Sequence, residues 1–407
     1  MEPRGTPMRS KLTICFTLPY SRRKITGIGR FVGDLARKLE NTHIESMILA
    51  PWTSGTASED GSLRLLGTFV LNFQLAVLTA VRLFRVRRKF QIVHAQHAQI
   101  QSLAACFAAR ILGKPSVITL HGQVPDPSGR IRKALKGLSE QFSVKTATKV
   151  VAVSTFVAQQ FSKDRGDIEV IENGVDTKVF RPNATKRAQV RSSLNLDTKL
   201  TFIFAARWAK SKGIDLVLEA VRSPELASRH FVLLLAGEAD PTDVDDSLRT
   251  SDLLAAQSHL RILGPVSESL PDILSAADVF VLPSLHEGMP LGLLEGMATG
   301  LPALVSDIEV NRMIVERSGC GWTIRSGDAV DLSNVMDEIV TKGVPASFPA
   351  KARAAVERYH NLDDEVRHYL SVYERLVRDS AAVQAASPGN PGHPARKPRW
   401  SRKSTGG

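Results

Sequence analysis

The sequence predicts an α/β protein built from two doubly wound, Rossmann-like domains that face each other across a cleft. Short apolar runs alternate with longer stretches of helical periodicity along most of the 407 residues. Continuous apolar strands separated by helices are typical of parallel sheets that helices cover on both faces. Two such series occur, and a chain of this length exceeds what one hydrophobic core ordinarily organises. We therefore expect two domains of the same general type.

Six apolar runs in the first half are expected to be strands of the first domain. They are LTICFTL (12–18), SMILA (46–50), QIVHA (91–95), SVITLH (116–121), KVVAVS (149–154) and IEVIE (168–172). Helical patterns at 31–40 and 103–112 lie between them. The first run is short and ends at Pro19, so we interpret it as a strand rather than as a signal peptide.

The segment FVLNFQLAVLTAV (69–81) is apolar and is followed by the basic stretch RLFRVRRKF. It is too short to span a bilayer, which takes about 20 residues. Two interpretations stay open. The segment is a half-buried helix whose basic end is solvated, or it lies in a membrane interface with its arginines at the headgroups.

Five runs in the second half are expected to be strands of the second domain. They are TFIFAA (201–206), FVLLLAG (231–237), RILGPV (261–266), VFVLPS (279–284) and PALVSD (302–307), with a helical pattern at 213–222. Turn residues and charges at 173–186 mark the boundary. We expect domains over 10–180 and 181–361, and a helix around 362–378 that completes the first domain. The Pro/Gly/Ser-rich, basic segment 382–407 is predicted to be disordered.

The net charge of +12 is unevenly distributed. Residues 1–200 hold 31 Lys and Arg against 14 Asp and Glu, whereas residues 201–380 hold 17 against 27. This asymmetry indicates that the first half faces an anionic partner, and an anionic membrane surface is one candidate. No nucleic-acid-binding motif is present, and the chain has only 4 Trp and 4 Tyr, so nucleic acid is not an expected partner. The three cysteines have no paired or metal-ligand spacing, which fits a reducing compartment and a cytoplasmic location.

The segment HEGMPLGLLEGMATGLP (286–302) places two glutamates eight residues apart in an apolar stretch. Glu287 lies in the loop after a predicted strand, and Glu295 lies more than one turn into the helix that Pro290 begins. Ligands of open α/β sheets bind at such loops, and a helix start suits phosphate. Carboxylates accept hydrogen bonds from vicinal diols, so the pair could hold a sugar, a phosphate and a second sugar. The alternative is two ordinary solvated glutamates. A glycosidase pair is not expected, because its carboxylates must face each other.

The segment VFVLPSLHEGMPLGLLEGMATGLPALVSD resembles the E-x7-E signature of retaining nucleotide-sugar glycosyltransferases with the two-domain GT-B fold, similar to glycosyltransferase family 4. Further segments resemble motifs of that family in the same order. They are TGIGRFVGDLARKL, FQIVHAQHA with VITLHG, VVAVSTFVAQQF with VIENGVDTKVF, AARWAKSKGIDLVLEAV, and VLLLAGE with RILGPVSESLPDILSAADVFVLPS. The resemblance covers most of the chain, and the order of the motifs makes it specific.

The resemblance implies a role for several residues. Glu295 would bind the ribose hydroxyls of the donor, and Glu287 the hydroxyls of the transferred sugar. Arg207 and Lys212 would hold the diphosphate, and His121 would lie near the donor sugar. The remaining implied nucleotide-site positions are Gly27 and Gly29, which would let the backbone approach the phosphates, together with Met289 and Leu291. His94 and His97 are interpreted as structural.

The sequence departs from the family pattern at several places. Ala206 stands where a glycine often precedes the arginine, and Pro290 lacks the N–H of the usual residue. Gln96 replaces the second histidine of a His-x-His motif. The usual Gly-Gly-x-x-Glu after Ser306-Asp307 is missing, and Met313 stands where the glutamate would fall.

The resulting expectation is a retaining glycosyltransferase that moves a sugar from a nucleotide-diphosphate sugar to a glycan or lipid-linked acceptor in bacterial envelope polysaccharide or glycolipid synthesis. In the resembled family, the leaving diphosphate itself takes the acceptor proton. No cofactor and no metal are expected, although the aspartates at 240–246 are a candidate cluster. Location on the inner face of the cell membrane is an option beside the free cytoplasm. The alternatives are a catalytically inactive binding or scaffold protein of the same fold and a nucleotide-sugar epimerase.

Overall fold

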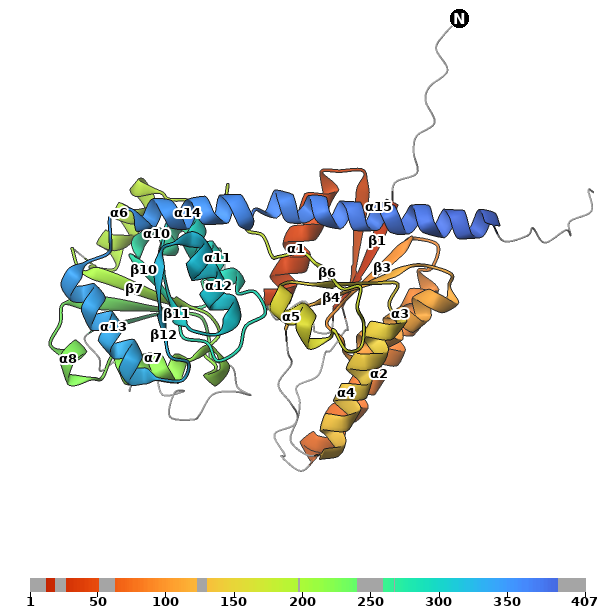
Figure 1. Ribbon diagram of the computed structural model, residues 1–407, viewed down its shortest axis with the longest axis horizontal. Helices are drawn as coiled ribbons and strands as arrows, with labels where there is room; N and C mark the ends of the chain where they lie inside the picture. Colours follow the sequence, from red (N-terminus) through yellow and green to blue (C-terminus); the bar gives the residue numbers. More distant parts are fainter. Residues whose placement is uncertain are drawn as a thin grey trace, which may run out of the picture.

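The computed structural model describes residues 12–18, 27–50, 63–122, 130–196, 198–239, 259–266 and 268–386, and side chains are not described at 63–72, 131–132, 227 and 383–386. Within these residues the chain forms two sheets, each of six parallel strands with helices between them (Figure 1). The predicted α/β fold with two doubly wound domains is confirmed. The aspartates at 240–246 lie outside the described residues.

The N-terminal sheet has the strand order β2-β1-β3-β4-β5-β6, and all its neighbouring strands are parallel. Its strands are β1 (Leu12–Thr17), β2 (Ile44–Leu49), β3 (Ile92–Gln96), β4 (Ser116–Leu120), β5 (Lys149–Ala152) and β6 (Glu169–Val170). The helices between them are α1 (Gly27–Glu40), α2 (Leu63–Arg85), α3 (Ile100–Ile111), α4 (Arg130–Thr146) and α5 (Thr155–Gln160). The order reverses between β1 and β3, and such a switch point is where open α/β sheets bind ligands.

The C-terminal sheet has the strand order β12-β11-β10-β7-β8-β9 and reverses between β7 and β10. Its strands are β7 (Leu200–Ala205), β8 (Phe231–Ala236), β9 (Leu260–Gly264), β10 (Val279–Leu282), β11 (Ala303–Ser306) and β12 (Gly321–Ile324). Its helices are α6 (Ala184–Ser193), η1 (Lys210–Lys212), α7 (Ile214–Ala220), α8 (Pro224–Ala227), α10 (Leu270–Ala276), α11 (Leu291–Ala298), α12 (Glu309–Ser318), α13 (Ala329–Lys342) and α14 (Phe348–Tyr359).

The faces of the N-terminal sheet are covered by different helices. Leu83 of α2, Cys106 of α3 and Val144 of α4 belong to the buried cluster on one face. Phe31 of α1 and Tyr369 of α15 (Leu362–Ala386) belong to the buried cluster on the other. Both faces are therefore apolar, which explains why the strands are continuous apolar runs rather than alternating ones.

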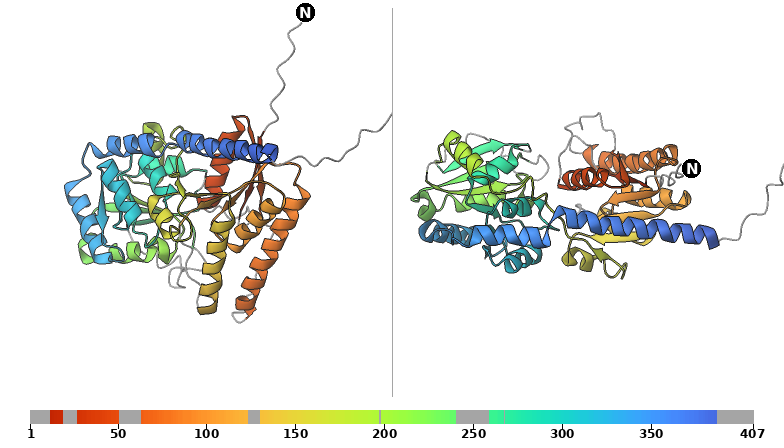
Figure 2. Two further views of the ribbon diagram at one scale, coloured as in Figure 1. Left: turned by 45° about the vertical axis from the view of Figure 1, so that its right-hand side comes forward. Right: turned by 90° about the horizontal axis from the view of Figure 1, so that it is seen from above.

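The long helix α15 returns from the C-terminal domain to the N-terminal sheet (Figures 1 and 2). A buried polar network fastens it there. His94 of β3 bonds Tyr373 through Nδ1 (2.7 Å) and Thr119 through Nε2 (2.7 Å), and Thr119 bonds Tyr369 (2.9 Å). His94 is fully buried, and burial lowers its pKa to about 3. Its structural interpretation agrees with this network, in which every member has a partner.

Two chain crossings join the domains, and they run side by side. The Val175 N–H donates to the His360 carbonyl (2.8 Å), and the Leu362 N–H donates to the Val175 carbonyl (3.1 Å). A Cβ on Gly174 would lie 2.6 Å from the Leu362 backbone, so the approach requires glycine. Glu365 of α15 accepts a hydrogen bond from the Gly174 N–H (2.5 Å) in this junction.

All eleven predicted strands are present in the structure, with small shifts of their ends. One strand was not predicted, because Gly321–Ile324 is short, lies at an edge of the sheet and is only partly buried. The predicted helix around 362–378 is α15, which begins at Leu362, and α14 ends shortly before it at Tyr359, so that a first helix precedes a second one. The second helix extends to Ala386, so 382–386 is helical and not disordered, and the rest of the predicted tail lies outside the described residues. Within the described part of the chain, no helix is both long and apolar enough to cross a membrane.

Candidate functional site

The candidate residues follow the carboxyl ends of the strands next to the two switch points. In the C-terminal domain, Arg207 and Lys212 follow β7, and Glu287 and Glu295 follow β10. In the N-terminal domain, α1 follows β1 and His121 follows β4. Carboxyl ends of parallel strands meet at one edge of a sheet, so each domain contributes one group of side chains to the region where the domains meet.

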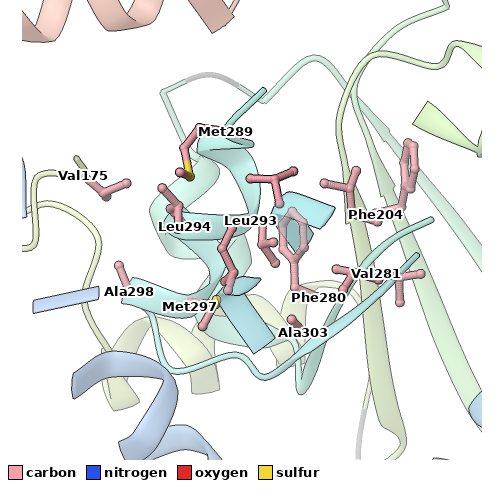
Figure 3. Close-up of a cluster of buried hydrophobic side chains, with 14 of the residues drawn as sticks. Val175, Phe204, Phe280, Val281, Met289, Leu293, Leu294, Met297, Ala298 and Ala303 are labelled. Carbon is pink, nitrogen blue, oxygen red and sulfur yellow. The ribbon is translucent and has the colours of Figure 1, made fainter. Parts of the chain in front are cut away.

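Helix α11, which carries Glu295, is buried on nearly all sides. Figure 3 shows its side chains Leu293, Leu294 and Met297 within the buried apolar cluster, with Phe280 of β10 alongside. A Cβ on Gly296 would lie 2.5 Å from the Phe280 ring, so glycine allows the helix to pack directly on the strand. The apolar composition of this segment is explained by burial, and Glu295, at 2% exposure, is the one acid within it. The interpretation of Glu295 as a solvated surface residue is wrong.

Glu295 pairs with a cation from the other domain. Nη2 of Arg30 in α1 donates to Glu295 Oε1. Glu295 Oε2 is buried and has no hydrogen-bond partner among the described residues. Burial raises the pKa of Glu295 to about 7, and the Arg30 guanidinium opposes this rise. The carboxyl group therefore keeps one buried acceptor oxygen for which the described protein supplies no donor.

Glu287 is held by Lys212 and Ser284. Lys212 Nζ donates to both carboxylate oxygens (2.7 and 2.9 Å), and Ser284 Oγ donates to Oε1 (2.7 Å). The Leu285 N–H donates to the Ser211 carbonyl (3.0 Å) and fastens the two loops to each other. Gly213 has a φ of +74°, and a Cβ at this residue would collide with the Pro283 backbone, so the close approach requires glycine. These contacts fix the ammonium group beside the carboxylate.

Arg207 begins the exposed part of the loop after β7. The neighbouring backbone is fixed to the loop after β8, since the Ala206 N–H donates to Ala236 (3.2 Å) and the Trp208 N–H to Glu238 (2.8 Å). Gly237 (φ +136°) lies against the Ala206 carbonyl and lets the two loops approach. The Trp208 indole Nε1 is buried and lacks a hydrogen-bond acceptor among the described residues.

His121 lies in a group of polar and aromatic side chains at the carboxyl edge of the N-terminal sheet. Its Nε2 bonds Gln96 Oε1 (2.7 Å), and its ring lies 4.7 Å from Phe31 and 5.3 Å from His97, measured between centroids. Burial lowers the pKa of His121 well below its ordinary value, and His97 and His94 lower it further. His121 is therefore neutral near pH 7 and acts as a hydrogen-bonding group rather than as a cation. Gln96 Nε2 is buried and also has no partner within the described chain.

The two domains touch directly between these groups. A Cβ on Gly288 would lie 2.6 Å from the His121 carbonyl carbon, and one on Gly122 would lie 3.2 Å from the Gly288 Cα. Asn173 Nδ2 donates to the Met289 carbonyl (3.0 Å). Leu291 packs against the apolar clusters of both domains. Met289 and Leu291, predicted as nucleotide-site positions, thus lie in the interdomain contact.

Gly27 and Gly29 lie in the first turn of α1, next to Arg30, which contacts Glu295 of α11. A Cβ on Gly27 would meet nothing within 4 Å, so the described structure leaves room beside it. Residues 19–26, which precede them in the sequence, lie outside the described residues. The structure brings Glu287 and Lys212 into contact and brings Glu295 to the start of α1, while Arg207 contacts neither glutamate in any described hydrogen bond.

Two residues of the candidate site, Arg30 and His97, are not predicted as site residues from the sequence. Arg30 is one residue beyond the predicted glycines, and its pairing depends on how the domains meet. His97, interpreted as structural, follows β3 directly and has a φ of +61°, which is uncommon for a residue other than glycine. Burial lowers the pKa of His97 to about 4. Its place after the strand beside the switch point was the signal that could have identified it.

Met313, which stands where the family pattern has a glutamate, packs against the core of the C-terminal domain. In the same segment, Asn311 Nδ2 donates to Ser306 Oγ (3.2 Å), and Ser306 Oγ donates to the Ser284 carbonyl. The departure from the family pattern therefore puts a half-buried apolar side chain where the pattern has a carboxylate. Across the described residues, no group of three or more His, Cys, Asp or Glu side chains is placed to hold a metal ion.

Comparison with protein families gives two consecutive matches. Residues 25–179 match Glycosyltransferase Family 4, and residues 199–342 match Glycosyl transferases group 1. Among curated proteins, the chain is 28% identical over 303 residues to the UDP-Gal:alpha-D-GlcNAc-diphosphoundecaprenol alpha-1,3-galactosyltransferase of Escherichia coli, covering 72% of this chain and 77% of that protein. It is 27% identical over 340 residues to the putative glycosyltransferase EpsF of Bacillus subtilis, covering 80% and 86% respectively.

Solved structures with a similar fold include a glycosyltransferase from Rickettsia africae, with a TM-score of 0.70 and 20% identity over 91% of this chain and 99% of that chain. Anabaena Alr3699/HepE in complex with UDP-glucose gives a TM-score of 0.71 and 18% identity over 89% of this chain and all of that chain. At these identities the similarity establishes the fold that the two chains share.

Proposed function

Since the chain carries a Glycosyltransferase Family 4 domain followed by a Glycosyl transferases group 1 domain in a GT-B fold and is a glycosyltransferase, we propose that it transfers a sugar from a nucleotide-diphosphate sugar to an acceptor with retention of anomeric configuration. The observation that carries the assignment of the donor site is the state of Glu295. It is a buried carboxylate at the switch point with one oxygen, Oε2, that lacks a donor among the described residues. Leaving such an atom unpaired costs free energy, and a ribose hydroxyl would supply the missing donor.

Other unpaired polar atoms lie beside the same residues. Gln96 Nε2, Asn173 Oδ1 and Trp208 Nε1 are buried without a partner in the described chain. Gln96 bonds His121, Asn173 bonds the Met289 carbonyl, and Trp208 follows Arg207. Native proteins leave few buried polar groups unpaired, so their presence next to the proposed donor site supports a bound polar ligand.

The proposed reaction places the leaving diphosphate near Lys212 and Arg207. Lys212 supplies a compact charge and Arg207 a planar set of donors, which stabilise the negative charge that develops as the glycosidic bond to the donor breaks. The start of α11 adds free backbone N–H groups. Glu287, held beside Lys212, would accept hydrogen bonds from the transferred sugar, and neutral His121 would bond a donor hydroxyl across the interdomain contact.

No described side chain is a clear general base. His121 is neutral, but its Nε2 already bonds Gln96. Retention is therefore proposed to follow the route in which the leaving diphosphate accepts the proton of the incoming acceptor hydroxyl on the same face. The bond from acceptor oxygen to the anomeric carbon forms as the bond to the diphosphate breaks, and the proton moves to a diphosphate oxygen.

The acceptor is proposed to be a glycan or lipid-linked sugar of bacterial envelope polysaccharide or glycolipid synthesis, with the enzyme in the cytoplasm or at the inner face of the membrane. The relatives support this proposal, because the Escherichia coli protein is named for a diphosphoundecaprenol-linked acceptor and UDP-galactose. The basic charge of the first half, which would face such an acceptor, agrees with an anionic diphosphate link.

The test begins with the unmodified protein and a set of nucleotide diphosphates and nucleotide sugars in a thermal-unfolding screen. A ligand at 100 times its Kd adds about 2.7 kcal/mol to the free energy of unfolding. The nucleotide sugar that stabilises the protein is then incubated with polyprenyl-diphosphate-linked saccharides, and the anomeric configuration of the product is read by NMR.

We expect nucleotide diphosphate release that depends on the acceptor, and a product with the configuration of the donor. An inverted product would contradict retention. Binding without turnover on any acceptor would favour the inactive scaffold, and a changed sugar without an acceptor would identify an epimerase. No stabilisation by any nucleotide would exclude the proposed donor site.

A further inference from the structure

The outward surfaces of α2, α3 and α4 are apolar where surface helices are ordinarily polar. Of the thirteen large hydrophobic side chains that are exposed among the described residues, nine lie on these three helices. They are Phe73, Val77, Leu78 and Val81 of α2, Phe107 and Ile111 of α3, and Leu135, Leu138 and Phe142 of α4. We refer to these nine side chains as the apolar surface.

The spacing of these residues places them on continuous stripes. On α2, Phe73, Val77 and Val81 are four residues apart and share one side, while Leu75, Ala76 and Leu83 of the opposite side are buried. Over this stretch α2 therefore carries apolar side chains on its outward side as well as on its buried side, with Gln74, Thr79 and Arg82 as the polar exceptions. Apolar residues on both sides are typical of helices that are buried or in contact with lipid.

The three helices form one layer. Helix α3 packs against both α2 and α4, and the long α2 and α4 extend away from the sheet (Figures 1 and 2). Phe107 and Ile111 on α3 are 58% and 59% exposed, and Phe142 on α4 is 53% exposed. Soluble monomers rarely expose apolar side chains gathered in this way unless the surface binds a partner.

The charge around the apolar surface is positive. Between Gly61 and Pro125 the sequence has eight Arg and Lys residues and no Asp or Glu. The three helices hold one carboxylate, Glu140, which pairs with Lys136 (3.5 Å). Arg85, Arg88 and Lys89 at the end of α2 and Arg110 of α3 are exposed, and no carboxylate of the described residues lies within ion-pair distance of them.

We propose that the apolar surface of α2, α3 and α4 docks on an anionic lipid bilayer, with its aromatic and aliphatic side chains inserted at the interface and the neighbouring cations on the headgroups. The positive charge favours an anionic bilayer over a second copy of the chain as the partner, because two copies joined here would bring their unpaired cations together. The inference does not depend on the donor site proposed above.

Two of the helices that carry the apolar surface begin near residues of the candidate site. In an α/β sheet, each helix begins where the preceding strand ends, so the N-terminal ends of α3 and α4 lie at the carboxyl edge of the sheet. Helix α4 follows the segment that begins at His121, and α3 begins four residues after Gln96.

The test is co-sedimentation of the full chain with vesicles of phosphatidylcholine alone and with vesicles of equal parts phosphatidylglycerol and phosphatidylcholine. One variant replaces four of the exposed apolar side chains, as Phe73→Gln, Val77→Gln, Phe107→Gln and Phe142→Gln. A second replaces the unpaired cations, as Arg85→Gln, Arg88→Gln, Lys89→Gln and Arg110→Gln. The matched control replaces two exposed apolar residues of the C-terminal domain, as Ile262→Gln and Val330→Gln.

We expect the unmodified protein and the control to sediment with the anionic vesicles and to be released as salt rises. The cation variant should bind the anionic vesicles at least ~100-fold more weakly, because it loses the attraction of four cations to the headgroups. The apolar variant should lose vesicle binding even at low salt. Because the replaced side chains are exposed, thermal unfolding should be unchanged. Failure of the unmodified protein to bind anionic vesicles would overturn the proposal. So would vesicle binding that survives the apolar replacements, or a concentration-dependent dimer that the apolar variant abolishes in the absence of lipid.

Discussion

Arg30 and Glu295 form an ion pair between the two domains, joining residues 265 positions apart in the chain. The guanidinium group comes from the first turn of α1, and the carboxylate is the one acid within the buried helix α11. The pair links the site proposed for the donor ribose to the N-terminal domain. It also opposes the effect of burial on the pKa of Glu295.

Replacing Arg30 should shift the pH dependence of nucleotide binding. Hydrogen bonds from ribose hydroxyls favour the ionised carboxylate, so affinity for a nucleotide diphosphate should rise with pH through the pKa of Glu295, about 7. In Arg30→Met the stabilising cation is gone, the pKa of Glu295 rises, and the midpoint moves to higher pH. Calorimetric titration between pH 5.5 and 9 measures it. Arg37→Met, which removes an exposed cation of the same helix, should leave the midpoint in place, and equal midpoints in all three proteins would refute the coupling.

The two glutamates should differ in which ligand they affect. Glu295→Ala is expected to weaken nucleotide sugar and free nucleotide diphosphate alike, by about 1.5–3 kcal/mol for each lost hydrogen bond to a charged acceptor. Glu287→Ala should lower turnover without weakening the free nucleotide diphosphate, since it releases Lys212 to bond the phosphates. Binding of both ligands is measured by calorimetry and turnover by nucleotide release. The same loss of affinity for both ligands in both variants would exclude this division of roles.

Activity should survive EDTA, because Lys212 and Arg207 are proposed to neutralise the leaving diphosphate. Lys212→Ala should then reduce turnover by ~10²-fold or more, the scale of losing one preorganised charge-stabilising group. Lys210→Ala removes an exposed lysine of the same short helix and should have little effect. Loss of activity in EDTA that Mg²⁺ or Mn²⁺ restores would show that the two cations are insufficient and would direct attention to the aspartates at 240–246.

Gly288→Ala should disturb the interdomain contact and leave each domain folded. The new Cβ would lie 2.6 Å from the His121 carbonyl carbon, so the loops must separate. We expect turnover to fall while nucleotide binding to the C-terminal domain changes less. Gly33→Ala, where a Cβ meets nothing within 4 Å, is the control and should be as active as the unmodified protein. Unchanged turnover in a folded Gly288→Ala protein would show that this contact is not needed in the reaction.

Stability should decline as pH rises above neutrality, because two buried carboxyl groups resist ionisation. Burial raises the pKa of Glu365 to about 8 and that of Glu295 to about 7, from an ordinary 4.5. For an acid with a raised pKa, the stabilising contribution is complete below 4.5 and is lost as pH passes the folded-state value. The buried histidines, whose pKa values are lowered, add the opposite trend below their ordinary value of 6.5. The midpoint of thermal unfolding should therefore fall between pH 7 and 9.

Glu365→Gln should flatten that decline, since the amide keeps an acceptor for the Gly174 N–H and carries no charge. At pH 9 the free energy of unfolding of this variant should exceed that of the unmodified protein by ~2 kcal/mol or more, because burial raises the pKa of Glu365 by several units. Glu374→Gln, on the exposed side of the same helix, is the control and should follow the unmodified protein. A decline of the same slope in Glu365→Gln would mean that this group does not set the pH dependence.

The sequence was sufficient for the strands and for the order of the domains. A parallel strand buried on both faces needs a continuous apolar run, and that requirement is local, so eleven strands could be identified without the structure. Gly321–Ile324 was missed because an edge strand that is partly exposed carries no such run. The start of α15 at Leu362 agrees with the predicted helix around 362–378, whereas the pairing of Asn361 with Val175 just before it joins residues distant in sequence and needed the structure.

The sequence by itself determined which residues stand at the carboxyl ends of the strands, and hence that Glu287, Glu295, Arg207, Lys212 and His121 belong to one edge of each sheet. Only the tertiary structure decided how they pair. It joined Glu287 to Lys212 through the contact of Gly213 with Pro283, and Glu295 to Arg30 across the domains. The reason is that strand formation follows from the apolar pattern of neighbouring residues, whereas the partner and the pKa of a buried charge depend on what packing brings within a few ångströms of it.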